Sequence, residues 1–203
     1  MPNALSSFTR RGLLLLTGAS ALSACARDRF RLEPVVIGGA AVLPEMTIME
    51  AIDASADHRR LADALRASGL DEPLSGPGPF TLLAPTDRAF EGIRPKSDGE
   101  RVRGDPAILK RTLRSHIFPA QVSKADITAG IDANGADTKA LGLNGLPVTF
   151  DRKDGILRAF DPRGRRALLG PVDAIAANGL IHVIDEVLLL PEEEQDEAAK
   201  VLP

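Results

Sequence analysis

The sequence predicts an α+β fold, and two patterns carry that prediction. Before residue 120, apolar residues recur at helical spacing in several segments. After residue 140, apolar and polar residues alternate, and glycine-containing turns separate the alternating runs. Helical segments early and β-hairpins late are typical of an α+β domain. A chain of 203 residues with a net charge of −3 suits one domain with tails.

The first 24 residues have the pattern of a signal peptide. Arg10 and Arg11 precede an apolar run that ends at Ala24 and is too short for a membrane span of roughly 20 apolar residues. The small residues that lead into Cys25 resemble a bacterial lipobox, which implies cleavage before Cys25 and its acylation. The arginine pair allows a twin-arginine export route, and the general secretory route stays open.

Cys25 is the only cysteine, so no intramolecular disulfide is available, and an incidental thiol is the alternative to a lipid anchor. Two or more acyl chains give stable anchoring. An acylated Cys25 predicts a protein held at the bacterial envelope, facing the periplasm or the cell surface. Ala26 follows the cysteine, which favours the outer membrane by analogy with lipoprotein sorting.

The remaining chain divides into three parts. Residues 25–44 are expected to be a linker, because charged residues and four breakers interrupt any regular element: Pro34, Gly38, Gly39 and Pro44. Residues 45–191 are expected to fold as the domain. Residues 192–203 are expected to be an acidic, solvated tail.

The first elements of the domain follow from capping signals. Thr47 and Glu50 have capping-box spacing and predict a short helix. A second helix is expected near His58, which we expect to face solvent, with Gly69 after its end. A proline- and glycine-rich turn at 75–79 leads into an apolar run.

The run at 80–84 predicts a buried strand that Pro85 ends. A short helix is expected after Thr86, followed by a polar loop at 94–104. Asp105-Pro106 predicts a helix start, because Asp caps and Pro suits the first turn. The apolar stripe of that helix is Ile108, Leu109, Leu113, His116 and Ile117.

Hairpins dominate the second half. Apolar and polar residues alternate from 146 to 151, Lys153-Asp154-Gly155 is the expected turn, and 156–160 is the returning strand. A second turn at 161–164 precedes 165–169. Asn178-Gly179 favours a positive-φ turn between strands at 174–177 and 180–190.

Two segments resemble the signatures of the fasciclin domain. Residues 80–90 read Phe-Thr-Leu-Leu-Ala-Pro-Thr-Asp-Arg-Ala-Phe, and residues 178–189 read Asn-Gly-Leu-Ile-His-Val-Ile-Asp-Glu-Val-Leu-Leu. The resemblance covers 45–191 and implies a wedge of β-strands with a helical layer, and non-catalytic adhesion or matrix-type binding. The matching signature residues are Thr81, Pro85, Thr86, Asp87, Phe90, His116, Asn178, Gly179, His182 and Asp185.

Catalysis is not expected. His182 and Asp185 lie three residues apart in a predicted strand, so their side chains point to opposite faces. The histidines at 58, 116 and 182 lack metal-ligand spacing, and the chain lacks a phosphate-binding loop and a nucleophile elbow. We interpret His116 and His182 as hydrogen-bonded core residues and expect no catalytic residue, metal or cofactor.

Charge and composition limit the classes of molecule that the protein is expected to bind. An acidic chain without Trp or Tyr is poorly suited to nucleic acid. Basic residues nevertheless crowd the hairpin region and are candidates for an anionic polysaccharide or lipid headgroups, although a solvated polar face is the alternative: Arg152, Lys153, Arg158, Arg163, Arg165 and Arg166. The acidic tail is a candidate to mask them.

The sequence therefore predicts a membrane-anchored, non-catalytic binding or adhesion protein with one fasciclin-like domain. Its partners are expected to be the membrane, through Cys25, and a surface, matrix or envelope component. The alternative is a periplasmic ligand-binding or envelope scaffolding protein.

Overall fold

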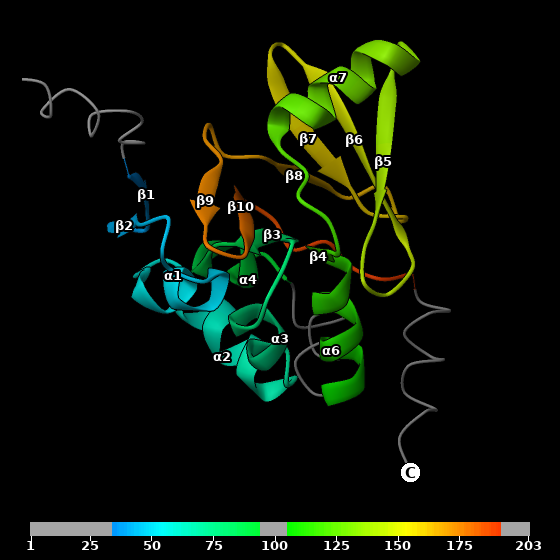
Figure 1. Ribbon diagram of the computed structural model, residues 1–203. Coiled ribbons are helices and arrows are strands. Elements are labelled where there is room, and N and C mark those ends of the chain that lie inside the picture. Colours follow the sequence, from blue (N-terminus) through cyan, green and yellow to red (C-terminus); the bar gives the residue numbers. More distant parts are fainter. Residues whose placement is uncertain (1–33, 94–104, 192–203) are drawn as a thin grey trace, which may run out of the picture. The chain divides into compact units, whose positions relative to one another are not determined.

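The computed structural model of the protein describes residues 34–93 and 105–191. The expected signal peptide, Cys25, the loop at 94–104 and the acidic tail lie outside these residues. Within them, a central sheet separates a layer of helices from a layer made of a second sheet and one helix (Figure 1). None of the helices in the described ranges has the length and apolarity needed to cross a membrane.

The central sheet has the strand order β4-β3-β10-β9. Its two inner strands run parallel, and each outer strand is antiparallel to its neighbour. Leu82 of β3 packs into one core and Leu83 into the other, so the strand is buried on both faces. The strand predicted at 80–84 is confirmed. The strands are β3 (Phe80–Pro85), β4 (Ile117–Phe118), β9 (Ala174–Ala176) and β10 (Gly179–Ile184).

Five helices of the described residues cover one face and enclose the first core. Thr47 forms the expected capping box with Glu50, and Asp105 caps the helix that begins at Pro106. Gly69 has a φ of +65°, as its predicted place after a helix requires. The helices are α1 (Ile48–Ala54), α2 (Arg59–Ala67), α3 (Asp71–Ser75), α4 (Asp87–Glu91) and α6 (Pro106–Ser115).

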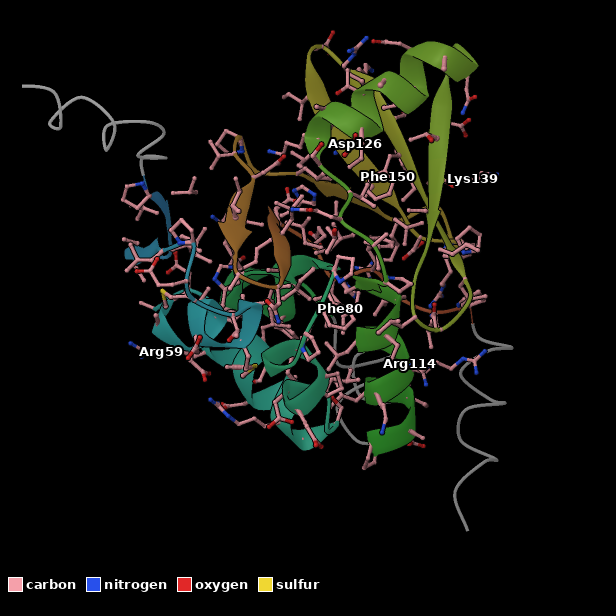
Figure 2. All side chains as sticks on the ribbon, viewed as in Figure 1. Arg59, Phe80, Arg114, Asp126, Lys139 and Phe150 are labelled. Carbon is pink, nitrogen blue, oxygen red and sulfur yellow. The ribbon has the colours of Figure 1, made fainter. Side chains whose placement is uncertain are left out.

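The other face carries the second core, beneath α7 and an antiparallel sheet of order β5-β6-β7-β8. Figure 2 shows Phe150 inside this layer. Asp154 and Gly155 form the turn of the predicted hairpin, with φ angles of +53° and +78°. The elements are α7 (Lys124–Asn134), β5 (Asp137–Leu141), β6 (Pro147–Lys153), β7 (Ile156–Phe160) and β8 (Arg166–Leu168).

The prediction of a linker at 25–44 is wrong for residues 35–42. Strands β1 (Val35–Ile37) and β2 (Ala40–Val42) form a hairpin, so the fold begins before residue 45. Gly38 and Gly39 make its turn at φ angles of +51° and +80°. These two glycines turn the chain instead of breaking it, and Ile37 and Val42 then reach the first core.

The expected turn at Asn178-Gly179 is also displaced. Gly179 pairs with Ala176, so Ala177 and Asn178 are the two turn residues. In the described ranges Asp154 is the only non-glycine residue with a positive φ, so Asn178 does not adopt that geometry. Gly179 is needed for another reason: a Cβ there would lie 1.9 Å from the carbonyl oxygen of Phe80.

All three histidines are buried. His58, expected to face solvent, is the residue before α2, and its Nδ1 lies 2.7 Å from the hydroxyl of Ser55. His116 follows α6. Its Nε2 accepts a hydrogen bond of 3.0 Å from the Leu188 amide, so its Nδ1 carries the proton toward the Thr112 carbonyl at 2.9 Å. The contact with the Leu188 amide requires a neutral ring, because a protonated Nε2 cannot accept a hydrogen bond.

His116 makes stability depend on pH. Burial lowers its pKa from 6.5 to about 4, against the opposing hydrogen bond to Thr112. Below pH 6.5 the unfolded chain binds a proton there that the folded chain does not, so stability falls as pH falls from 6.5 to 4. Burial also lowers the pKa of His58, with the same sign. We expect the titration of His116 to lower the free energy of unfolding by about 2 kcal/mol when the pH falls from 7 to 5.

Urea unfolding followed by circular dichroism at the two pH values measures this loss. The control is His116→Gln, which is less stable at pH 7 but cannot titrate. Its stability should fall less between pH 7 and pH 5 than that of the parent. Equal falls in the two proteins would show that His116 is not the source.

Candidate binding surface

The first signature supplies contacts that hold the helical layer. Thr86 caps α4, with its hydroxyl 3.3 Å from the Ala89 amide. Asp87 instead accepts a hydrogen bond of 2.8 Å from the amide of Arg60, at the start of α2, where the preceding His58 provides no side-chain cap. Two adjacent signature residues therefore cap two different helices, while Phe90 packs in the first core.

Asn178 of the second signature joins three segments. Its Oδ1 accepts a hydrogen bond of 2.8 Å from the Ile48 amide, and its Nδ2 donates to the carbonyls of Leu74 and Gly76 at 2.7 and 2.8 Å. It thus satisfies backbone groups at the start of α1 and around the end of α3. Asp185 lies beyond β10, where it accepts the amide of Leu168 at 2.6 Å.

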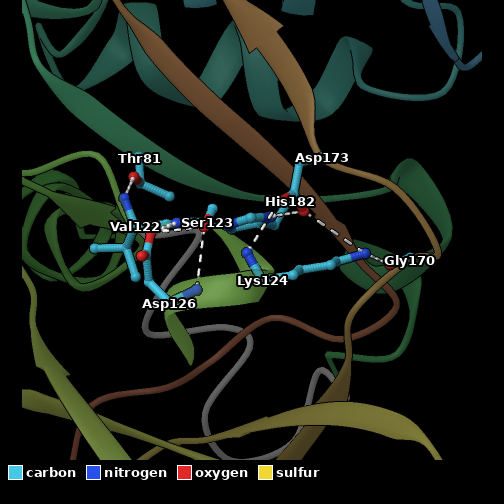
Figure 3. A network of polar contacts seen from close by, with 8 residues as sticks. All are labelled: Thr81, Val122, Ser123, Lys124, Asp126, Gly170, Asp173 and His182. Atoms are coloured by element: carbon cyan, nitrogen blue, oxygen red, sulfur yellow. Dashed lines mark hydrogen bonds and ion pairs between the residues drawn. The ribbon is translucent and has the colours of Figure 1, made fainter. Parts of the chain in front are cut away.

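A polar network ties the central sheet to the start of α7 (Figure 3). His182 is fully buried, with Nε2 2.7 Å from the Val122 carbonyl and Nδ1 3.0 Å from Oδ1 of Asp173. Asp173 also accepts the Lys124 amide at 3.0 Å, and the Lys124 ammonium donates to the Gly170 carbonyl. Thr81 adds a hydroxyl that accepts the Val122 amide at 2.8 Å.

The electrostatics of the network follow from burial and pairing. Burial raises the pKa of Asp173, but the hydrogen bonds from His182 and from the Lys124 amide outweigh it, so the pKa lies below its ordinary value. Burial lowers the pKa of Lys124, and the nearby Asp173 carboxylate opposes that shift. His182 is the core histidine that its place in the strand predicts, and its acidic partner is Asp173 rather than Asp185.

The candidate basic residues do not form one patch. Arg152 and Arg158 lie on opposite faces of the sheet. Arg152 is on the face of the buried Phe150 and Leu157, whereas Arg158 is opposite Asp151 on the other face. Arg152 pairs with Asp132 of α7 at 2.7 Å. Lys153 ends β6 at the hairpin tip, and Arg163 is exposed in the turn before β8.

Three of the candidates do converge. Arg158, Arg165 and Arg166 line one open cavity of about 530 Å³ together with Gly92, Phe160, Gly164 and Glu186. Arg158 makes a two-point contact with Asp151, including Nε to Oδ1 at 2.6 Å, and its guanidinium lies 5.3 Å from the Phe160 ring centre. Arg165 pairs with Glu186 at 3.3 Å.

Asp161 holds the turn from which Arg165 projects. Its Oδ1 accepts the amides of Arg163 and Arg165, both at 2.9 Å, and its Oδ2 accepts the Leu189 amide at 2.9 Å. Burial raises the pKa of Asp161 against these three hydrogen bonds. The backbone beneath the arginine cavity is therefore fixed to the chain that follows β10.

The cavity is suited to an anionic group. Guanidinium groups bind carboxylate, sulfate or phosphate oxygens through parallel hydrogen bonds. Arg166 is exposed and has no acidic partner among the residues that the structure describes. In those same ranges, no group of three or more His, Cys, Asp or Glu side chains is placed to hold a metal ion.

Sequence reasoning missed the roles of Asp161 and Asp173, because each binds a backbone amide distant in the sequence, that of Leu189 or of Lys124. The hydrogen bonds of Asp161 to the Arg163 and Arg165 amides are local and typical of an Asp in a turn. A signal was available for the basic residues, since the alternation of a strand separates neighbours such as Arg152 and Lys153. The predicted hairpin places Asp151 opposite Arg158, so that pair had a local signal, whereas nothing local indicated that Glu186 would pair with Arg165.

The network predicts a stability effect. Asp173→Asn removes the charge that faces His182 and Lys124 but keeps the shape of the side chain. We expect it to lower the unfolding free energy by about 1–3 kcal/mol, because the buried His182 ring loses the carboxylate that faces it and the partly buried Lys124 ammonium loses its counter-charge. Asp63→Asn is the matched control, because Asp63 is 84% exposed with a 3.9 Å contact to Arg66. Equal urea midpoints for the two variants would contradict a structural role for the network.

Comparisons with known proteins agree with this architecture. The family model described as Fasciclin domain matches residues 56–191. Transforming growth factor-beta-induced protein ig-h3 from Sus scrofa is 33% identical over 144 residues, which are 70% of this chain and 19% of that protein. Protein sll1483 from Synechocystis is 32% identical over 158 residues, covering 77% of this chain and 80% of that protein.

A solved structure shares the fold. The FAS1 domain pair of the insect cell adhesion molecule fasciclin I matches with a TM-score of 0.61 at 17% identity, over 75% of this chain and 53% of that one. The expected α+β fold with a single domain of this type is confirmed. The central strands, their two cores and the matched family model lead to one conclusion: this protein belongs to the fasciclin-domain family.

Proposed function

We propose that this protein is an exported, non-catalytic binding protein that is anchored to the envelope membrane through Cys25 and binds anionic polysaccharide through its arginine cavity. The family match supports a binding role, because fasciclin domains are generally non-catalytic binding domains. The solved relative is described as a cell adhesion molecule, which supports a surface or matrix component as the target.

The convergence of Arg158, Arg165 and Arg166 on one cavity carries the proposal. Asp151 and Phe160 hold Arg158 from two sides, and Glu186 holds Arg165. These contacts reduce the net charge of the cavity, but they also order the side chains before a ligand arrives. Ordered donors lose less conformational freedom on binding.

Carboxylate or sulfate groups of a polysaccharide fit this arrangement. Arg166 offers a guanidinium without an acidic partner in the described chain, and the two paired arginines retain N–H groups beyond those used internally. A stable protein partner would instead need an interface of at least about 1,000 Å² in total. Many anchored copies on one membrane would give avidity to a weak single contact.

The cavity predicts salt-sensitive binding. The double variant Arg165→Gln/Arg166→Gln should bind immobilised polyuronate or heparin at least about tenfold more weakly, because each charge-assisted hydrogen bond contributes roughly 1.5–3 kcal/mol. Binding of the parent should also weaken as salt screens the charges. Affinity chromatography and calorimetry measure both effects.

The matched control is Arg59→Gln, which alters one charge on the outer side of α2 (Figure 2). A loss of binding in this control equal to the loss in a single Arg166→Gln variant would mean that net charge alone drives binding. Parent binding that does not change with salt would also contradict the proposal.

The anchor predicts a membrane location that depends on Cys25. Cys25→Ala should move the protein from the membrane fraction to the soluble fraction, because acyl chains supply the attachment. A Cys25→Ala protein that has lost residues 1–24 and still stays in the membrane fraction would contradict lipid anchoring.

Protease treatment of intact cells then separates the two placements. Digestion of the domain in intact cells supports a surface-exposed binding protein. Protection until the outer membrane is opened would contradict surface adhesion and favour the periplasmic ligand-binding or scaffolding alternative.

A further inference from the structure

Large apolar side chains are exposed at one end of the fold. Among the described residues six such side chains are exposed, and four of them lie on or beside β1, β2 and β9: Val36, Leu43, Val172 and Ile175. The other two, Leu141 and Ile156, lie in the second sheet. Exposed apolar residues that cluster indicate an interaction surface, whereas singly scattered ones are ordinary.

The strands concerned lie side by side. Both β1 and β2 contact β9, and Figure 1 shows the three together at one side of the central sheet. Ile37 and Val42 of the hairpin share the first core with Ala174 and Ala176 of β9. Val36 and Ile175 alternate with these buried residues, so both point away from that core.

The apolar surface is next to the point where the proposed anchor joins the fold. Eleven residue steps separate Cys25 from Val36, which is about 40 Å of chain at full extension. A domain of this size has a diameter of about 40 Å. The end that carries β1 therefore cannot stand farther than one domain diameter from the bilayer that holds the lipid.

We propose that the surface formed by Val36, Leu43, Val172 and Ile175 rests on the bilayer in which Cys25 is anchored. This inference rests on the proposed lipid anchor and adds a second contact to it. Apolar side chains partition into the headgroup and acyl boundary, and the acyl chains on Cys25 keep the surface within reach. The domain is then held with a defined face toward the lipid instead of swinging freely.

The composition of the chain allows a direct test. The protein has no Trp and one Cys, so one introduced Trp is the sole indole probe, and a maleimide phospholipid in phosphatidylcholine vesicles couples only at Cys25. The test protein is residues 25–203, which retain the whole compact unit of residues 34–203. The probes are Val36→Trp and Ile175→Trp, and the matched controls are Leu141→Trp and Ile156→Trp, which replace exposed apolar residues elsewhere.

Trp emission from Val36→Trp and Ile175→Trp should shift to the blue on coupling. Brominated lipids should quench it at least about twofold more than in the controls, because membrane-bound apolar faces lie roughly 5–10 Å deep in the boundary. Adding Val36→Asp to Ile175→Trp should remove the shift. Circular dichroism of every variant checks the fold.

Equal quenching of probes and controls would overturn the proposal. A blue shift without quenching by brominated lipid would overturn it too, since it would indicate that a second copy covers the surface. The chemical coupling makes this test independent of acylation in the cell. A failure here leaves the proposed anchor standing, and a failure of acylation leaves this result standing.

Discussion

The parallel pairing of β3 with β10 is the constraint on which the rest of the structure depends. The pair joins Phe80–Pro85 to Gly179–Ile184 across nearly the whole domain, and it is buried on both faces. The missing side chain of Gly179 permits the close approach to Phe80. Both layers pack against these strands, so the two signatures describe one long-range strand pair and the groups that secure its ends.

Polar side chains of the signatures serve this construction. Asn178 and Asp87 satisfy backbone groups at helix ends, while His182 and Asp173 connect the strand pair to α7. Buried polar groups that lack a partner cost free energy, so each of these contacts favours a single arrangement of the layers. Histidine is common in catalytic sites, but the three histidines of this chain make structural contacts in the interior.

The two proposed binding surfaces lie outside the two cores. The arginine cavity lies on the second sheet and the segments around it, where Asp161 fixes the local backbone. The apolar surface around Val36 and Ile175 lies on other strands. A domain with one face on lipid and another open to a polymer would link the two without any moving part, which suits a rigid, doubly cored fold.

The sequence by itself determined the elements that have local signals. Capping residues Thr47 and Asp105, the Asp154-Gly155 turn and the apolar run of β3 act within a few residues, so their effects are readable in order. Gly38-Gly39 between two apolar runs and the Ser123/Asp126 capping pair are also local signals, for the β1–β2 hairpin and for α7, but they were not recognised in the sequence. Only the tertiary structure decided that this hairpin packs into the first core, that Asp173 faces His182, and which arginines meet. These outcomes depend on burial and on charged partners supplied by segments distant in the chain.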